Sequence, residues 1–226
     1  MRVLWPHVRA KGYELEVVES HIKLASAGSK SEERRLKGRL MADHFQTIPN
    51  YRGKLLVARP HVMRDPTFAE SVVYIYEQRD NMVLGLVLNK PTKMSIGDLQ
   101  SMRGISNSGA LGSLYKGGPV SEQSLLLLHT DEWQSTNTLP VGNNLCLSSD
   151  ELMLDKLADG NLPNGYRLMS GMASWSQPQL YTEINKHKAW LVIDPSITIF
   201  FDSNDGNDQW KRAIQLASSR IVESLF

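Results

Sequence analysis

The stretch GMASWSQPQL, residues 171–180, decides how this chain folds. An apolar run at 166–172 enters it, and residues 179–188 leave it with the spacing of a helix. We therefore expect a strand-to-helix corner here. Ser176, with Gln179 three residues later, has the spacing of a capping box at a helix start. The corner could be an active site, an anion-binding helix start or a packed turn.

Ser174 is the candidate nucleophile at this corner. The nucleophile elbow of α/β-hydrolases needs Gly-x-Ser-x-Gly, because the strained turn tolerates no flanking side chains. Met172 and Ser176 stand where the two glycines are required, and the bulky Trp175 follows directly. This pattern disfavours nucleophilic catalysis. It favours a packed corner in which Gly171 allows close approach and Trp175 fills the core.

Strands and helices are predicted on both sides of the corner. Apolar and β-branched runs predict strands, and 3.6-residue periodicity with capping signals predicts helices. The expected strands are 53–58, 71–78, 82–90, 124–130, 166–173, 189–193 and 197–201, and the expected helices are 95–102, 151–157, 177–188 and 205–226. Gly85 inside a strand suggests a bulge or a close backbone approach. Strands that are both paired and alternating with helices predict an α+β fold with a mixed sheet.

The composition predicts one domain with an N-terminal extension. Of 226 residues, 41% are hydrophobic and 22% charged, which is ordinary for a globular core. Residues 1–43 carry nine Lys or Arg against six Asp or Glu, whereas residues 44–226 carry 16 against 18. We expect residues 1–43 to be a poorly packed extension, either flexible or upstream of a true start at Met41. Residues 44–226 are expected to form the domain.

The sequence predicts no cofactor and no metal. Cys146 is the single cysteine, so an intrachain disulfide and a Cys-based zinc site are excluded. No two histidines have the i, i+4 spacing of a helical zinc pair. Gly117 and Gly118 lack the spacing of a phosphate-binding loop, and a turn with close backbone approach is expected instead. No apolar run approaches the ~20 residues of a membrane span, and we expect a cytoplasmic protein.

His129 is the candidate acid–base group. It ends the apolar run 124–130, where a histidine is usually a hydrogen-bonded structural residue, although imidazole is also the readiest acid or base near pH 7. No carboxylate pair can be placed together from the spacing. A hydrolase using His129 with Ser174 or a carboxylate therefore stays an alternative.

Four blocks in order resemble the AlgH/YqgE family of bacterial proteins. They are LLVARPHVMRDPTFAESVVYIYEQ (55–78), GLVLNKP (85–91), GGPVSEQSLLLLH (117–129) and GMASWSQPQLYTEI (171–184), the last followed by AWL. Each block alone is not specific to the family, but the four blocks in this order are strong evidence for the resemblance. The chain departs from the family pattern at Ser124, Leu125 and Lys188, among other positions, and so resembles a divergent member.

The resemblance implies a bent, pseudo-barrel sheet flanked by helices, and a regulator of transcription with no defining biochemical activity. We expect a non-enzymatic regulatory or binding protein whose partner is a protein or a small ligand, and no membrane contact. Direct nucleic-acid binding is disfavoured. The basic run 34–39 is the one cluster of positive charge in the sequence that could contact phosphates. The candidate ligand or interaction region comprises Asn89, Gly117, Gly118, Pro119, His129, Gly171, Ser174 and Trp175.

Overall fold

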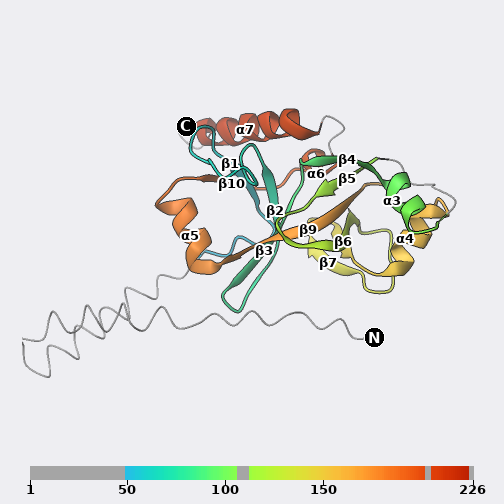
Figure 1. Ribbon diagram of the computed structural model, residues 1–226. Coiled ribbons are helices and arrows are strands. Elements are labelled where there is room, and N and C mark those ends of the chain that lie inside the picture. The colour runs from blue at the N-terminus through green and yellow to red at the C-terminus, as the bar shows by residue number, and fades with distance from the viewer. Residues whose placement is uncertain (1–48, 106–111, 202–204, 224–226) are drawn as a thin grey trace, which may run out of the picture. The chain divides into compact units, whose positions relative to one another are not determined.

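A computed structural model describes residues 49–105, 112–201 and 205–223. These residues belong to one compact unit, Ile48–Phe226. The extension predicted at residues 1–43, and its boundary, lie outside the described residues and stay predictions. The strands of the described part are β1 (Leu55–Ala58), β2 (Val72–Arg79), β3 (Met82–Val87), β4 (Pro91–Ser95), β5 (Ser113–Lys116), β6 (Val120–Thr130), β7 (Leu139–Gly142), β8 (Leu145–Ser148), β9 (Tyr166–Ser176) and β10 (Trp190–Ile193). Its helices are α3 (Ile96–Met102), α4 (Glu151–Ala158), α5 (Gln177–Asn185), α6 (Ile197–Phe200) and α7 (Gly206–Glu223) (Figure 1).

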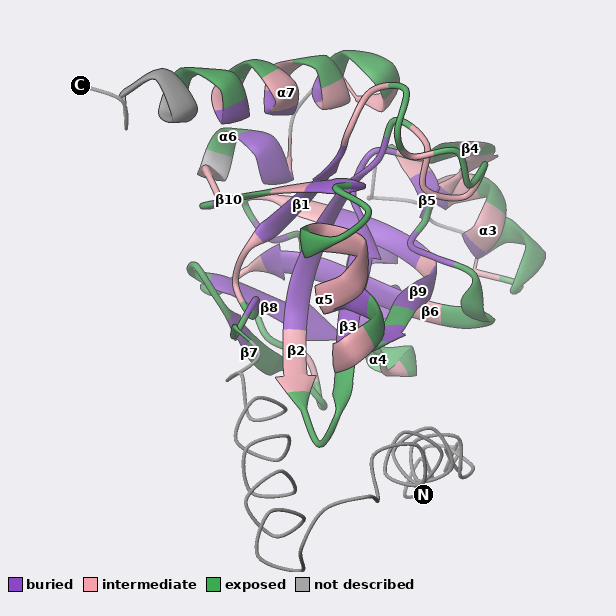
Figure 2. Cartoon of the chain, turned by 90° about the vertical axis from the view of Figure 1, so that its left-hand side faces the viewer, coloured by how far each residue is buried: buried purple, intermediate pink, exposed green. Residues whose placement is uncertain are grey.

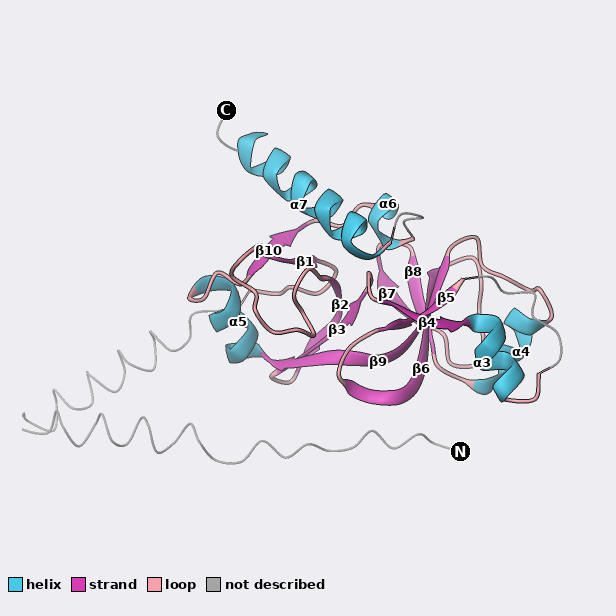
Figure 3. Cartoon of the chain, turned by 45° about the horizontal axis from the view of Figure 1, so that its top comes forward, coloured by secondary structure: helices cyan, strands magenta, loops and turns pink. Residues whose placement is uncertain are grey.

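The strands form a single curled sheet in the order β10-β1-β2-β3-β9-β6-β8-β7, with β4 and β5 off this path. All pairs are antiparallel except β5 with β9. The sheet curves as a half-barrel rather than lying flat (Figure 3). The predicted α+β fold with a bent, mixed sheet is therefore confirmed.

Strand β9 joins the two parts of the sheet. Its first half pairs with β6, from Tyr166 to Met172, and its second half pairs with β3, from Ala173 to Ser176. The strand changes partner between Met172 and Ala173, next to Gly171, whose φ of 71° lies in the left-handed region. A glycine is suited to this position because a side chain there would be strained. The stretch quoted first above is thus the point where the sheet turns.

Three apolar clusters hold the helices on the sheet, whose central strands are buried (Figure 2). Helix α7 covers the concave face, where Ala213 and Ala217 pack among the residues of β1, β2 and β6. Helix α5 packs through Leu180 on the opposite face, beside Trp175 and Trp190. Helix α4 covers a third cluster with β6 and β9. Successive side chains of a strand point to opposite faces, so the continuously buried runs of β1, β2 and β3 supply both faces with apolar side chains.

The predicted hairpin at residues 71–90 is present as β2 and β3. Asp80 and Asn81 at its tip both have positive φ, as a two-residue type I′ turn requires. Tyr76 is an extra residue in β2, between the pairs Ile75–Gly85 and Glu77–Leu84. A Cβ atom on Gly85 would lie 2.8 Å from Val73 Cγ1. Of the two alternatives expected for Gly85, the close approach is found at the glycine itself, and the bulge lies opposite it, in β2.

Two local expectations are wrong. Residues 197–201, predicted as a strand from their β-branched and aromatic composition, include the short helix α6 instead. Pro195 has no N–H to continue the ladder beyond β10, and the helical turn buries Ile199 and Phe200 in the concave core. Strand β9 also runs three residues beyond its predicted end, to Ser176, whereas α5 begins at Gln177 as predicted.

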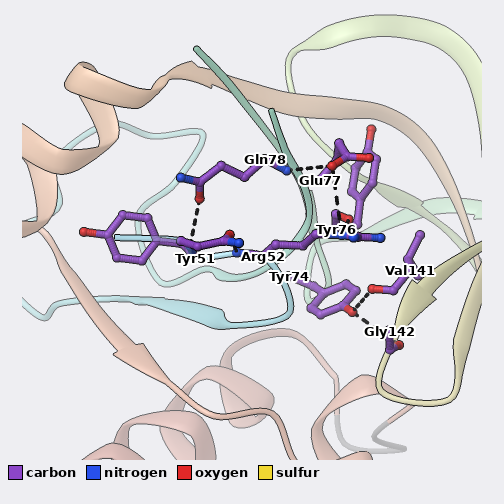
Figure 4. Close-up of polar contacts among 9 residues, drawn as sticks. Tyr51, Arg52, Tyr74, Tyr76, Glu77, Gln78, Val141 and Gly142 are labelled. Carbon is purple, nitrogen blue, oxygen red and sulfur yellow. Dashed lines mark hydrogen bonds and ion pairs between the residues drawn. The ribbon is translucent and has the colours of Figure 1, made fainter. Parts of the chain in front are cut away.

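The end strand β7 folds back onto the face of β2. The Tyr74 hydroxyl donates to the Val141 carbonyl at 2.6 Å, and the Asn143 amide donates to that hydroxyl at 3.2 Å and to the Gly53 carbonyl at 3.1 Å. Figure 4 shows the Tyr74 ring pointing at the β7–β8 hairpin, with Arg52 stretched along the neighbouring end of β2. These contacts close one end of the half-barrel.

Candidate functional site

The predicted Gly-Gly-Pro segment is a backbone crossing. A Cβ atom on Gly117 would lie 2.3 Å from the Gly171 oxygen, and one on Gly118 would lie 2.2 Å from the Met172 carbonyl carbon. A Cβ atom on Gly171 would lie 2.6 Å from the Gly118 oxygen. Real Cβ atoms do not approach so closely, so glycine is required on both sides of the crossing.

The same crossing uses its backbone polar groups internally. The Gly117 N–H donates to the Ser170 carbonyl at 2.8 Å, and the Gly117 carbonyl accepts from the Val87 N–H at 2.8 Å. Gly117 thereby links β9 to β3, while Pro119 follows as an exposed residue. The Gly117 N–H and carbonyl are therefore hydrogen-bonded within the sheet, as expected of a turn with close backbone approach rather than of a phosphate-binding loop.

Asn89 is a buried link between three segments. Its Oδ1 accepts from the Val72 N–H at 2.8 Å, and its Nδ2 donates to the carbonyls of Glu70 and Gly206 at 2.8 and 2.9 Å. Both amide hydrogens are used. Asn89 therefore fixes the start of β2 and the start of α7 to the end of β3, which is a structural use of the side chain.

Arg167 lies at the centre of a buried polar cluster that the sequence analysis missed. Its guanidinium donates to the Leu88 carbonyl and, at 3.0 Å, to Gln209 Oε1, and it lies 4.2 Å from the centre of the Tyr115 ring. The Tyr115 hydroxyl donates to Asp205 Oδ2 at 2.6 Å. Burial lowers the pKa of Arg167 and raises the pKa of Tyr115 to about 12. The signal that could have found the cluster is an arginine on the inward face of an apolar strand.

His129 is fully buried and hydrogen-bonded at both nitrogens. Its Nδ1 lies 2.8 Å from the Thr130 carbonyl, so this nitrogen carries the proton, and its Nε2 lies 3.0 Å from Ser148 Oγ, from which it accepts. Its ring packs edge-on against Trp133 at 4.8 Å. Burial lowers the pKa of His129 below its ordinary value of 6.5. The imidazole is therefore held neutral and out of contact with solvent.

Ser174 is remote from His129 along the sheet. His129 pairs across the strands with Tyr166, whereas Ser174 lies eight residues further along β9, opposite Leu84. The structure does not bring the two side chains of the hydrolase alternative together. Ser148, which does contact His129, is itself fully buried.

Trp175 is a core residue, and Ser176 is the helix cap. The Trp175 ring lies 5.4 Å from Phe68 and 6.2 Å from Trp190, between ring centres. The Ser176 hydroxyl accepts from the Gln179 N–H at 3.2 Å, as predicted. The Gln179 side chain does not return this bond and instead donates to Glu183 at 2.9 Å. Of the eight predicted site residues, Gly117, Gly118 and Gly171 come together at the crossing, whereas Asn89, His129 and Trp175 have separate contacts. Pro119 and Ser174 are exposed.

Neither a candidate metal site nor a membrane-spanning helix is found among the described residues. They contain no group of three or more His, Cys, Asp or Glu side chains that could hold a metal ion. None of their helices is both long enough and apolar enough to cross a membrane.

One end of the domain carries cations that the sequence analysis did not connect. We call Arg59, Arg64, Lys186 and Lys188 the basic end. The Arg59 N–H donates to the Ala189 carbonyl at 2.9 Å, so the β1–β2 connection lies beside the α5–β10 connection. Among the described residues, none of the four cations has an ion-pair partner.

The two segments that carry the basic end pack on the same buried apolar cluster. Met63 from the first connection and Ile184 from α5 pack against the same buried cluster, which includes Trp190. Figure 2 faces this end and shows the connections around β1, β10 and α5 as exposed or intermediate. Because the cations come from segments more than a hundred residues apart, spacing along the sequence could not reveal them.

The chain is similar to proteins of one bacterial family. The sequence profile described as AlgH-like matches residues 55–221. A UPF0301 protein of Marinomonas sp. is 32% identical over 155 residues, covering 67% of this chain and 81% of the relative. A UPF0301 protein of Xanthomonas campestris is 30% identical over 176 residues, covering 76% and 90%.

Solved structures agree with the sequence relatives. The solution structure of the AlgH protein from Pseudomonas aeruginosa has a TM-score of 0.60 and 28% identity, over 75% of this chain and 89% of that one. A Corynebacterium diphtheriae protein has a TM-score of 0.58 at 24% identity, over 74% and 87%, and shows the shared fold alone. The resemblance of the four sequence blocks is confirmed, and the chain belongs to the AlgH-like family.

Proposed function

We propose that this protein is a non-catalytic binding protein that recognises an acidic surface of another protein through its basic end. The observation that carries the proposal is the set of four cations without an ion-pair partner in the described part of the chain. Segments 59–64 and 186–189 contain these four Lys or Arg and no Asp or Glu.

The acidic residues that flank the basic end are engaged locally. Asp65 Oδ1 accepts from the Thr67 N–H at 2.8 Å, and Glu183 Oε2 accepts from Trp190 Nε1 at 2.9 Å. They shape the two connections that present the cations. A partner carboxylate would therefore meet three exposed cations, Arg64, Lys186 and Lys188, and the half-buried Arg59, none of which is ion-paired within the described part of the chain.

A protein partner fits this surface better than a nucleic acid does. Duplex binding draws its affinity from neutralising many phosphates along an extended stripe. The basic end supplies four charges on two short connections, and residues 44–226 carry more acidic than basic side chains. A regulatory role of the kind that the family resemblance implies would then act through protein contact rather than through DNA.

The contacts of the predicted site residues support the same proposal. His129 and Ser148 are hydrogen-bonded to each other in the core, and the Asn89 side chain is hydrogen-bonded to three backbone groups. The exposed hydroxyl of Ser174 lies away from the imidazole along β9.

The test is binding of fluorescent polyglutamate to the full chain, measured by anisotropy at low and moderate salt. We expect salt-dependent binding that weakens about tenfold in the double variant Lys186→Glu, Lys188→Glu, which corresponds to ~1.4 kcal/mol. The matched control is Lys93→Glu, Arg103→Glu, which makes the same charge change at exposed positions on β4 and at the end of α3.

The control should bind within about twofold of the unaltered chain, because exposed charges outside the contact contribute little. Equal losses in both double variants would show that net charge alone governs binding, and the proposal would fail. Tighter binding of a 20-base-pair duplex than of polyglutamate, lost in the same variant, would assign the basic end to nucleic acid instead.

A further inference from the structure

Strand β10 leaves one edge of the sheet open. It is the end strand beyond β1, and the Arg59 N–H bond to the Ala189 carbonyl sets the alternation of the ladder. Leu191 and Ile193 therefore bond to β1, while the N–H and carbonyl groups of Trp190 and Val192 point away from it. Among the described residues, these outward groups have no hydrogen-bond partner. Trp190 is only 2% exposed, so the accessible part of this edge is at Val192.

The opposite edge of the sheet is closed. Strand β7 contains Pro140, which has no N–H, and the Val141 carbonyl accepts from the Tyr74 hydroxyl. Closure by proline and by a capping side chain is a usual way to prevent strand addition at an edge. The two ends of the sheet therefore differ, and β10 is the end that lacks these protections.

The open edge adjoins the basic end and carries an exposed apolar side chain. Lys188 precedes β10 by two residues, and Arg59 lies at the opposite register position to Ala189. Val192 is 37% exposed. An added strand would find backbone donors and acceptors, a small apolar contact and cations at the beginning of β10.

We propose that β10 accepts an extended, acidic segment of a partner protein as an additional strand of the sheet. The proposal rests on the function proposed above and specifies how the partner docks. Main-chain hydrogen bonds would supply affinity, and carboxylates beside the basic end would select the segment and set its position.

The charge of the neighbouring surface favours this occupant over others. A nucleic acid lacks the alternating N–H and carbonyl groups that extend a β-ladder. A second copy could pair β10 with β10, but that contact would use four residues from each chain and leave the basic end unmatched. An acidic peptide strand satisfies both the open backbone groups and the cations.

The probe is a synthetic ten-residue peptide of alternating glutamate and valine, titrated against the full chain with hydrogen exchange followed by NMR. We expect the Val192 and Trp190 amides to exchange at least tenfold more slowly with peptide bound. The same peptide with N-methylated valines, and a lysine–valine peptide, should bind at least tenfold more weakly. The first cannot extend the ladder, and the second has the wrong charge.

Two variants separate the backbone from the side chain. Val192→Pro removes the outward N–H and should weaken peptide binding at least tenfold, whereas Val192→Ala keeps it and should stay within about threefold. If Val192→Pro does not fold, the comparison of normal and N-methylated peptides on the unaltered chain still decides the question.

Three results would overturn strand addition. Peptide binding without protection of the Val192 and Trp190 amides places the contact elsewhere. Equal binding of the N-methylated peptide shows that the backbone is not read. Protection of these amides without peptide, in a dimer seen by sedimentation, shows that a second copy occupies the edge. None of these results affects the polyglutamate test with the Lys186 and Lys188 variants. Strand addition can therefore be wrong while the proposed function is still supported.

Discussion

Gly171 and Gly104 have nearly the same backbone conformation but different surroundings. Their φ angles are 71° and 77°, yet a Cβ atom on Gly171 would meet the Gly118 oxygen at 2.6 Å, whereas one on Gly104 would meet nothing within 4 Å. The pair therefore separates the cost of backbone strain from the cost of a clash at the crossing.

We expect Gly171→Ala to lower the free energy of unfolding by about 4 kcal/mol, because both costs apply. Gly104→Ala should cost about 1 kcal/mol, from left-handed strain alone. Urea unfolding followed by circular dichroism measures both. Similar losses in the two variants would mean that the crossing relaxes, and that the close contact is not what requires glycine.

His129 makes stability depend on pH in the acid direction. Burial lowers its pKa in the folded state below 6.5, so the unfolded chain takes up the proton first as pH falls. Its contribution is fully present above about pH 6.5 and is lost below that, by at most ~1.4 kcal/mol per pH unit.

The variant His129→Gln has no titrating ring, and the difference between the two chains isolates this group. Urea midpoints at pH 7.5, 6.5 and 5.5 should converge for variant and unaltered chain as the pH falls. Parallel curves would show that the imidazole does not titrate differently on folding.

At the scale of elements, the start of α5 depends on one hydroxyl. Ser176 accepts from the Gln179 N–H, whereas Ser174, two residues earlier, is exposed in β9. We expect Ser176→Ala to lower the free energy of unfolding by about 1 kcal/mol, through loss of the cap.

Ser174→Ala is the matched control and should stay within about 0.5 kcal/mol. Thermal unfolding of the two variants checks the contrast. A larger effect at Ser174 would indicate a role for this hydroxyl that the structure does not reveal.

Local signals predicted the elements that depend on local physics. A few neighbouring residues determine each of three such features: the helix start at Ser176, the hairpin turn at Asp80 and the close approach at Gly117. Residues 197–201 misled the prediction, because composition favoured a strand where no strand partner was available. Strands β4, β5, β7 and β8 were missed, since such short segments become strands through their partners.

The candidate site was less predictable for the same reason. Arg167 gains its role from α7, and the basic end exists because Ala58 pairs with Trp190 across the whole domain. For His129 the sequence left both a structural and an acid–base role open, and its hydrogen-bond partner Ser148 comes from a neighbouring strand. Contacts of this kind follow from topology, which spacing along the chain does not contain.

At the scale of the whole molecule, Tyr74 closes the half-barrel. Its hydroxyl connects β2 to the β7–β8 hairpin, and its ring packs on Phe200 at 4.9 Å. Tyr74→Phe keeps the ring and removes the hydroxyl. We expect a loss of about 1–2 kcal/mol and faster amide exchange in the hairpin, because the Val141 carbonyl loses its partner.

Tyr76→Phe provides the control, since the Tyr76 hydroxyl contacts the weak acceptor Met172 Sδ at 3.2 Å. Its loss should be below ~0.5 kcal/mol. Hydrogen exchange that is equally fast in both variants would contradict a closing role for Tyr74.

The pairing of β1 with β10 also has a consequence for synthesis on the ribosome. Ala58 pairs with Trp190, so 132 residues separate the two halves of this contact. At about 5–20 residues per second, β1 emerges on the order of 10 s before its outer partner. Throughout that interval the nascent chain presents the apolar strand Leu55–Ala58 with one side unpaired. Chaperones that bind emerging hydrophobic segments are therefore expected to engage this protein early, and to release it once its last strand has been translated.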